Sequence, residues 1–312
     1  MDRRVNRIVF IHEGKAAYPD VAAYMAYFQD RFRIEEAPAD VARADPELAN
    51  TICWHMMGFY PRRLPAAFVI HDYRSLSVGM GRRAKDWIKA RFNHRPDLRI
   101  YQNESIKRAL SINDGAPEVF LPMGVPDFIL RYRQAEPSAD QSRSEFCYIG
   151  AMLPERRIDT MIDSFLARYG STKVLALYGQ PEPDLVNRYQ KNTNVRFAGT
   201  LPQSELFPIL SSYSAAVCYF PNHYPHVLQT PTKLLEYAAL GMRIIANEQP
   251  QSRISAEQYG IRCHWGPADD MFKNAPGELD WADNASLRPE PMLWSSVIRA
   301  SGIEVVLDRL CS

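Results

Sequence analysis

The chain has 312 residues, which is long for one small domain and enough for two domains of about 150 residues each. Hydrophobic residues make up 46% and charged residues 23%, a globular composition that excludes disordered and fibrous chains. The net charge of +1 argues against binding by charge alone, so we expect no nucleic-acid partner. No apolar run approaches the roughly 20 residues of a membrane span, and we expect no signal peptide at the charged N-terminus.

The five cysteines include no C-x-x-C pair, and Cys53, Cys147, Cys218 and Cys263 fall in strand-like runs. This pattern is typical of buried, reduced thiols in a reducing compartment. We therefore expect a cytoplasmic protein without disulfides.

Short apolar runs rich in β-branched and aromatic residues recur along the chain and predict strands. In chain order these runs are residues 7–11, 51–56, 67–72, 98–102, 118–121, 145–149, 173–178, 194–198, 215–220, 242–247 and 261–265. Helix-like stretches follow most of them, at residues 20–32, 82–92, 158–169, 204–210 and 231–240. Strands that alternate with helices predict an α/β architecture with parallel sheets covered on both faces.

A polar stretch without periodicity, residues 133–144, interrupts this alternation and is the predicted linker. It separates a first doubly wound, Rossmann-like domain, residues 1–132, from a second, residues 145–285. The tail, residues 286–312, predicts one more helix, a candidate to cross back to the first domain. Ligands of such sheets bind at the carboxyl ends of the strands, so two facing domains would form a central cleft.

Basic residues concentrate in residues 79–99, with only two acidic residues among them. The basic residues are Arg82, Arg83, Lys85, Lys89, Arg91, Arg95 and Arg99. Trp87 and Phe92 lie between them. One interpretation is a solvated helix face, and the other is a surface for an anionic membrane or a lipid-phosphate acceptor.

The most informative segment is residues 229–247, QTPTKLLEYAALGMRIIAN. Its local chemistry predicts a helix with defined ends. Thr230 is a suitable N-cap, Pro231 suits the first helical position, and Gly241 suits the C-terminal stop.

Two charged residues of this segment, Lys233 and Glu236, are three positions apart and share a face near the helix start. The free N–H groups of a helix start attract anions, and Lys233 would strengthen such a site for a diphosphate. Glu236 could accept hydrogen bonds from a ribose diol. The alternative is an ordinary capped amphipathic helix.

The same segment resembles the signature of GT-B glycosyltransferases, in particular the retaining family 4 type, which uses nucleotide sugars. The family pattern is roughly P-x-K-L-x-E-Y-x-A-x-G-x-P-V-[IV]-A, and this chain has PTKLLEYAALGMRIIA from Pro231 to Ala246. Met242 and Arg243 stand where the family usually has a basic residue and a proline. Further segments resemble the family in the same order: Phe120–Val125, Phe146–Gly150 and Asn194–Gly199.

The resemblance also places single residues. Arg156 and Arg157 fall where the family often carries basic residues near the donor phosphates. The family usually has a glutamate that contacts the donor sugar seven positions before the one matching Glu236, but here that position is Leu228. The loop of residues 221–230 contains no carboxylate. The candidates to hold the sugar instead are His223, His226 and Gln229.

Polar residues also end predicted strands of the first domain: His12, Glu13, Gly14, His55, His71 and Asp72. Glu13 and Asp72 are the carboxylates best placed to take a proton from an acceptor hydroxyl. Gly14 would let the backbone approach a ligand. A histidine at a strand end is either a ligand contact or a structural hydrogen-bonding group. The pair His223 and His226 has no carboxylate partner nearby, so we expect no metal site in this chain and no cofactor.

The resemblance therefore implies a GT-B glycosyltransferase of the hexosyltransferase type, with an acceptor-binding first domain and a nucleotide-sugar-binding second domain. The expected acceptor is a glycan, a glycolipid or another sugar in polysaccharide or lipopolysaccharide-type biosynthesis, at the cytoplasmic face of a membrane. The implied reaction is transfer with retention. The alternatives are a nucleotide-sugar epimerase on the same fold and a non-catalytic protein that binds sugar nucleotides.

The candidate site residues follow from these arguments. The catalytic candidates are Lys233, Arg156, Arg157, Glu13 and Asp72. The donor-binding or substrate-binding candidates are Glu236, Thr230, Pro231, Thr232, Gly14, Gly150, His71, His223, His226 and Gln229.

Overall fold

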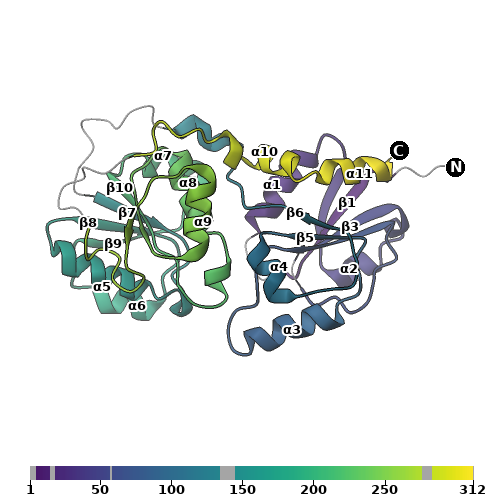
Figure 1. Ribbon diagram of the computed structural model, residues 1–312, viewed down its shortest axis with the longest axis horizontal. Helices are drawn as coiled ribbons and strands as arrows, with labels where there is room; N and C mark the ends of the chain where they lie inside the picture. Colours follow the sequence, from purple (N-terminus) through teal and green to yellow (C-terminus); the bar gives the residue numbers. More distant parts are fainter. Residues whose placement is uncertain (1–4, 15–17, 57, 134–144, 276–282, 312) are drawn as a thin grey trace. The chain divides into compact units, whose positions relative to one another are not determined.

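The structure is a computed structural model that describes residues 5–14, 18–56, 58–133, 145–275 and 283–311. It divides into two compact units, each built around its own sheet (Figure 1). The first unit contains the chain up to Gly124 and the segment from Leu293 onward, and the second contains Val125–Met292. None of the described helices is long and apolar enough to cross a membrane.

The sheet of the first unit is parallel throughout, in the order β2-β1-β3-β4-β5-β6. Its strands are β1 (Arg7–Ile11), β2 (Arg33–Ala37), β3 (Thr51–Met56), β4 (Phe68–Tyr73), β5 (Leu98–Tyr101) and β6 (Glu118–Phe120). Its helices are α1 (Pro19–Phe28), α2 (Ala39–Arg43), η1 (Leu48–Asn50), α3 (Arg82–Phe92), α4 (Glu104–Leu110), α10 (Trp294–Ala300) and α11 (Ile303–Cys311).

Alternation along the strands gives this sheet two different faces. On one face, Phe10 and Trp54 pack against Tyr24 of α1. Trp294 of α10 contacts the same tyrosine, with ring centres 5.8 Å apart. On the other face, α2 covers an apolar cluster that includes Val9, Ile11, Cys53 and Val69.

The sheet of the second unit has the order β12-β11-β10-β7-β8-β9 and is also parallel. Its strands are β7 (Glu145–Ile149), β8 (Val174–Tyr178), β9 (Val195–Gly199), β10 (Ala215–Cys218), β11 (Ile244–Asn247) and β12 (His264–Gly266). Its helices are η2 (Asp127–Tyr132), η3 (Pro154–Arg156), α5 (Ile158–Tyr169), α6 (Pro183–Tyr189), α7 (Gln203–Leu210), η4 (His226–Leu228), α8 (Thr232–Ala239), α9 (Pro250–Tyr259) and η5 (Glu290–Met292). The strand order reverses between β7 and β10, the point where doubly wound sheets bind ligands.

Both sheets confirm the expected class, α/β with two Rossmann-like doubly wound domains. One strand, β2, was not expected. Its sequence RIEEA alternates little, and most of its side chains are partly exposed because it lies at the edge of the sheet. An edge strand tolerates charged residues, which removes the apolar signal from the sequence.

The boundaries of the units differ from the expected ones. Residues 125–133 belong to the second unit: Phe128 packs against Phe207 of α7, and Arg133 donates hydrogen bonds to the carbonyl oxygens of Ala239 and Ala285, each at 2.7 Å. Beyond Arg133, the expected linker lies outside the described residues. The expected terminal helix consists of two helices, α10 and α11, separated at Gly302, whose φ of 73° breaks the helical path.

Candidate functional site

A pocket of about 500 Å³ opens in the second unit at the carboxyl ends of β7, β8 and β9 and beside the start of α8. This volume is typical of sites for small molecules. The lining residues are Tyr148, Ile149, Gly150 and Ala151, then Arg156, Tyr178, Gly179 and Gln180, then Thr200, Leu201, Gln203, Leu206, Phe207 and Phe220, and finally Thr232, Lys233 and Glu236.

Two glycines keep the floor of this pocket open. Gly150 has φ of 134°, and a Cβ there would lie 3.0 Å from the Nζ atom of Lys233. Gly179 has φ of 144°, and a Cβ there would lie 2.1 Å from the carbonyl oxygen of Gly150. Backbone atoms therefore form the floor of the pocket, with no side chain between them and a ligand.

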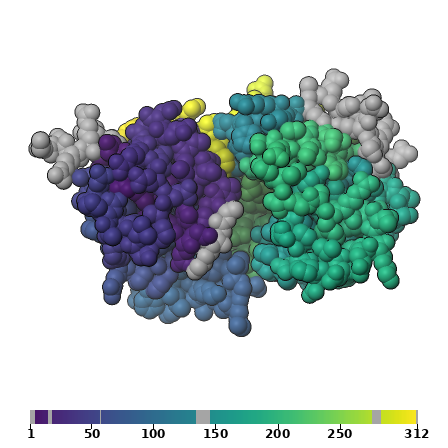
Figure 2. Space-filling view, turned by 180° about the vertical axis from the view of Figure 1, so that it is seen from behind, coloured from purple at the N-terminus to yellow at the C-terminus, as the bar shows by residue number. Residues whose placement is uncertain are grey.

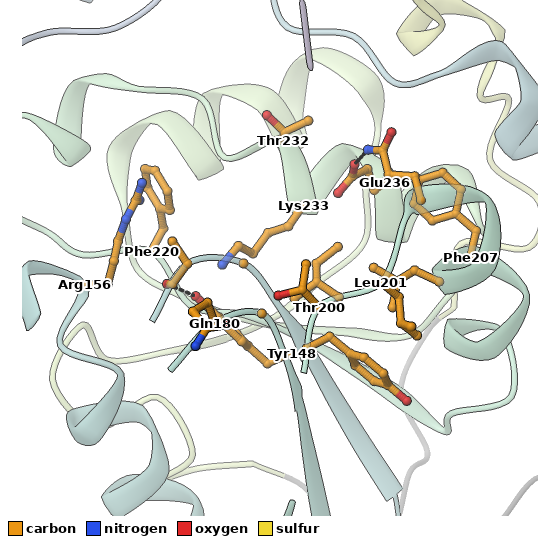
Figure 3. Close-up of a pocket in the computed structure, with 17 residues that line it drawn as sticks. Tyr148, Arg156, Gln180, Thr200, Leu201, Phe207, Phe220, Thr232, Lys233 and Glu236 are labelled. Carbon is orange, nitrogen blue, oxygen red and sulfur yellow. Dashed lines mark hydrogen bonds between the residues drawn. The ribbon is translucent and has the colours of Figure 1, made fainter. Parts of the chain in front are cut away.

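Lys233 is the second residue of α8 and extends toward the middle of the pocket (Figure 3). Its Nζ atom donates a hydrogen bond to the carbonyl oxygen of Tyr219 at 3.3 Å and lies 3.8 Å from the centre of the Tyr148 ring. Burial, and to a smaller extent the nearby charge of Arg156, lowers the pKa of Lys233 to about 7. A bound anion would favour the charged form of this side chain.

Glu236 lies one turn further along α8, on the other side of the pocket from Arg156 (Figure 3). Burial raises the pKa of Glu236 to about 7. Its carboxylate accepts a hydrogen bond of 2.7 Å from the Nε2 atom of Gln203 in α7. The remaining lone pairs of this carboxylate can accept hydrogen bonds from hydroxyl groups of a ligand.

The structure separates the expected arginine pair. Arg156 ends η3 and lines the pocket, with its guanidinium 5.0 Å from the centre of the Phe220 ring. Burial lowers the pKa of Arg156 from its ordinary value. Arg157 is exposed and does not line the pocket, because its φ of 51° turns the chain into α5. The pair is therefore corrected to a single pocket residue, Arg156.

The start of α8 differs from the expected one by one residue. The helix begins at Thr232, Pro231 is its N-cap with ψ of 106°, and the cap makes no side-chain hydrogen bond. Pro231 is therefore not the first helical residue, and Thr230 is not the cap; neither of them lines the pocket, whereas Thr232 does. Gly241 follows the helix with φ of 81°, as expected for a C-terminal stop.

The polar side chains of the loop before α8 support the loop and do not line the pocket. His223 approaches two carbonyl oxygens, those of Glu155 at 2.9 Å and Tyr224 at 3.0 Å. His226 is buried, and its ring lies 5.3 Å from that of His223. The side chain of Gln229 is 3.4 Å from His226. This geometry matches a structural role for the three residues that were expected to contact the sugar.

The candidates in the first unit lie in different surroundings. Glu13 and Gly14 are exposed beyond the end of β1. Asp72 is 1% exposed and accepts hydrogen bonds from Trp54 Nε1 at 3.1 Å and the Tyr24 hydroxyl at 3.2 Å. His71 is 2% exposed, on the opposite face of the same strand. β4 continues to Tyr73, so Asp72 and His71 lie within the strand and not at its end.

Four residues line the pocket that were not expected there: Tyr148, Gly179, Gln180 and Gln203. The signal was available in part: Gly179 and Gln180 directly follow a predicted strand, where ligands of parallel sheets bind. The contact of Gln203 with Glu236 depends on how α7 packs beside α8, which local sequence does not reveal.

No protein-family model matches the chain, and no curated protein matches it in sequence. Solved structures do match. The Anabaena protein Alr3699/HepE, in complex with UDP and glucose, has a TM-score of 0.67 and 11% identity over 98% of this chain and 100% of that one. AviGT4, a glycosyltransferase involved in avilamycin A biosynthesis, has a TM-score of 0.60 and 15% identity over 98% of both chains. The lipopolysaccharide outer core galactosyltransferase WaaB has a TM-score of 0.60 and 11% identity over 96% of this chain and 99% of that one. At such identities the likeness shows the fold: the chain has the GT-B fold, built from two Rossmann-like domains.

Proposed function

We propose that this protein is a glycosyltransferase that moves a sugar from a nucleotide-diphosphate sugar to a glycan, a glycolipid or another sugar acceptor. The observation that carries the proposal is the buried Lys233 beside Arg156 and the uncapped start of α8, in a pocket of about 500 Å³. This arrangement concentrates positive charge where it can hold a diphosphate. The similar HepE structure contains UDP and glucose, which makes uridine diphosphate sugars the first donors to test.

In this proposal four pocket residues have defined roles. Lys233, Arg156 and the first N–H groups of α8 stabilise the negative charge that grows on the diphosphate as the bond to the sugar breaks. Glu236, positioned by Gln203, accepts hydrogen bonds from the ribose hydroxyls. The acceptor hydroxyl forms the new bond to the anomeric carbon as the bond to the diphosphate breaks, and its proton passes to the oxygen of the leaving nucleoside diphosphate. These side chains carry the charge, so the reaction needs no metal ion. Retention of configuration, as in the family 4 type, is part of the proposal.

In this proposal the acceptor is associated with an anionic membrane, and the protein contacts that membrane through residues 79–99. Arg99 is buried and pairs with Asp114, but beside its other basic residues this segment exposes large apolar side chains: Met80 is 93%, Trp87 62% and Phe92 53% exposed. Figure 2 shows the blue surface that includes α3 at the lower border of the first unit. A helix that only faces water would not need these apolar groups, whereas a membrane surface takes up both kinds of side chain.

A panel of nucleotide sugars, screened by thermal unfolding, tests donor binding directly. A ligand at 100 times its dissociation constant should stabilise the protein by about 2.7 kcal/mol. Lys233→Ala should abolish this stabilisation or weaken it, whereas Lys191→Ala, which changes an exposed lysine of the same unit, should not. No stabilisation by any nucleotide sugar would contradict the proposal.

Product analysis separates the proposal from the two alternatives. Radiolabelled sugar that appears on an acceptor identifies a transferase. An epimerase would release epimerised sugar without an acceptor, and a non-catalytic protein would bind the donor without transfer or hydrolysis.

A further inference from the structure

Three histidines lie together on one face of the sheet in the first unit. His55 of β3 and His71 of β4 are direct neighbours in the strand register. His94 comes from the segment between α3 and β5. One nitrogen atom from each of the three rings lies within 4.8 Å of the other two. Residues far apart in the sequence thus present three imidazoles to one point.

Five of the six ring nitrogens of this cluster lack hydrogen-bond partners among the described residues. Both nitrogens of His55 and of His71, and the Nε2 atom of His94, are buried and unsatisfied. His55 is 1% and His71 is 2% exposed. Buried polar groups in proteins are nearly always satisfied, so this concentration of unsatisfied nitrogens indicates a ligand.

The hydrogen bond of His94 orients its ring so that the other nitrogen can bind a metal ion. Its Nδ1 atom lies 2.8 Å from the carbonyl oxygen of Tyr60, which can only accept. The proton is therefore on Nδ1, and the lone pair of Nε2 is available. Metal-binding histidines typically hold their second nitrogen in this way.

Two guanidinium groups act on the cluster, and each has an acidic partner. Arg63 lies 2.6 Å from a carboxylate oxygen of Asp97. Arg99 lies 2.7 Å from a carboxylate oxygen of Asp114. These ion pairs offset the repulsion that the arginines would exert on a bound cation.

We propose that His55, His71 and His94 bind one Zn²⁺ ion. Tetrahedral coordination with Zn–N bonds of about 2.0–2.1 Å sets the nitrogens roughly 3.3 Å apart, so the rings would move closer by up to roughly 1.5 Å when the ion binds. The ion joins β3, β4 and the segment before β5, and solvent occupies its fourth position. The partly exposed side of His94 is the way in. The site belongs to the first unit and is independent of the donor pocket and of the proposed function.

Metal analysis of the full chain, without a purification tag, tests this proposal. The protein is stripped with a chelator and dialysed against buffered Zn²⁺, and bound zinc is measured by mass spectrometry. We expect one zinc ion per chain, no comparable binding of Mg²⁺, and a higher unfolding temperature with zinc. Losing a residue that only supports a metal ligand typically weakens metal binding by about 10- to 100-fold. His94 is itself a ligand in this proposal, so His94→Gln should weaken zinc binding by more than about 100-fold. His264→Gln, a matched change in the second unit, should bind as the unchanged chain does.

Several results would overturn the proposal. A folded chain that binds no zinc, or a folded His94→Gln variant with unchanged zinc affinity, excludes this site. If His94→Gln does not fold, Co²⁺ added to the unchanged chain decides the question. Intense visible absorption typical of tetrahedral cobalt with nitrogen ligands supports the site, and its absence overturns it.

Discussion

The Nζ atom of Lys233 lies 3.8 Å from the centre of the Tyr148 ring. The ring face and the carbonyl oxygen of Tyr219 both favour the charged ammonium, whereas burial favours the neutral amine. Burial is the largest effect, and with the charge of Arg156 it lowers the pKa of Lys233 to about 7, well below that of an exposed lysine. Because the two forms are close in energy, an anion that enters the pocket will change the charge of Lys233.

The first prediction concerns the rate of transfer. Lys233→Ala should lower kcat by about 10²–10³ and weaken donor binding less, because charge on the diphosphate is greatest in the transition state. Lys191→Ala is the control. Transfer should also persist when Mg²⁺ and Mn²⁺ are withheld and EDTA is present. The unfolding temperature in the same buffer distinguishes lost chemistry from lost stability. Full activity of Lys233→Ala would contradict the role given to this residue.

The second prediction concerns the pH dependence of nucleotide binding. Since the pKa of Lys233 is about 7 in the free protein, its charge is lost as pH rises through 7. Binding of a diphosphate restores that charge by taking up a proton, so Kd should rise with pH, by at most about tenfold per pH unit. Glu236 titrates in the same range, so the titration is best done in Glu236→Gln. Calorimetry between about pH 7 and 9 measures the slope, and Lys233→Arg should flatten it.

The third prediction is that Glu236 lowers the stability of the folded chain but strengthens nucleotide binding. Its pKa is about 7 in the folded chain and 4.5 in an exposed side chain, so folding takes up a proton between these values. Stability therefore falls as pH rises through that window, and the loss persists above it. Glu236→Gln should stabilise the protein at pH 8 by up to about 3 kcal/mol, with little effect near pH 4.

The same substitution should raise the Kd for nucleotide by about 10-fold or more, through the loss of a charged hydrogen bond. Glu205→Gln, a change at an exposed glutamate of α7, should alter neither quantity. Denaturant unfolding at both pH values and calorimetry provide the measurements. Unchanged nucleotide affinity in folded Glu236→Gln would remove Glu236 from the site.

The fourth prediction compares two glycines with positive φ. Gly199 has no atom within 4 Å of the added Cβ, so Gly199→Ala should cost only the backbone strain of about 1–2 kcal/mol. Gly179→Ala adds a collision with the carbonyl oxygen of Gly150 and should cost clearly more, with weaker donor binding. Denaturant unfolding measures both variants. Equal losses would show that the floor of the pocket moves freely.

The fifth prediction concerns residues 79–99. Replacing Arg82, Arg83 and Lys85 with serine should abolish salt-sensitive binding to liposomes that contain acidic lipid, because each basic residue contributes about 1 kcal/mol at such a surface. Donor binding should be unchanged. The control variant replaces three exposed basic residues elsewhere: Arg43, Arg131 and Lys191. If the two variants partition alike, the segment is a solvated helix face.

The sequence alone determined the class of the fold and two charged residues that line the pocket, Lys233 and Glu236. Apolar runs alternate with amphipathic stretches because buried parallel strands and their covering helices each impose a period on the chain. Lys233 and Glu236 were predictable as a pair, since three residues along a helix bring side chains to one face. The ends of α8 were predictable to within one residue, from Pro231 and Gly241.

Only the tertiary structure decided which of the remaining candidates reach the pocket. Arg156 and Arg157 are adjacent in sequence, and a single positive φ sends one into the pocket and the other into solvent. Asp72 was expected at a strand end, but β4 continues beyond it, and Trp54 and Tyr24 enclose it. The cluster of His55, His71 and His94 has no sequence spacing that signals it, because strand register and one loop bring these residues together. Such contacts between distant segments depend on how the elements pack, and local sequence carries no record of that packing.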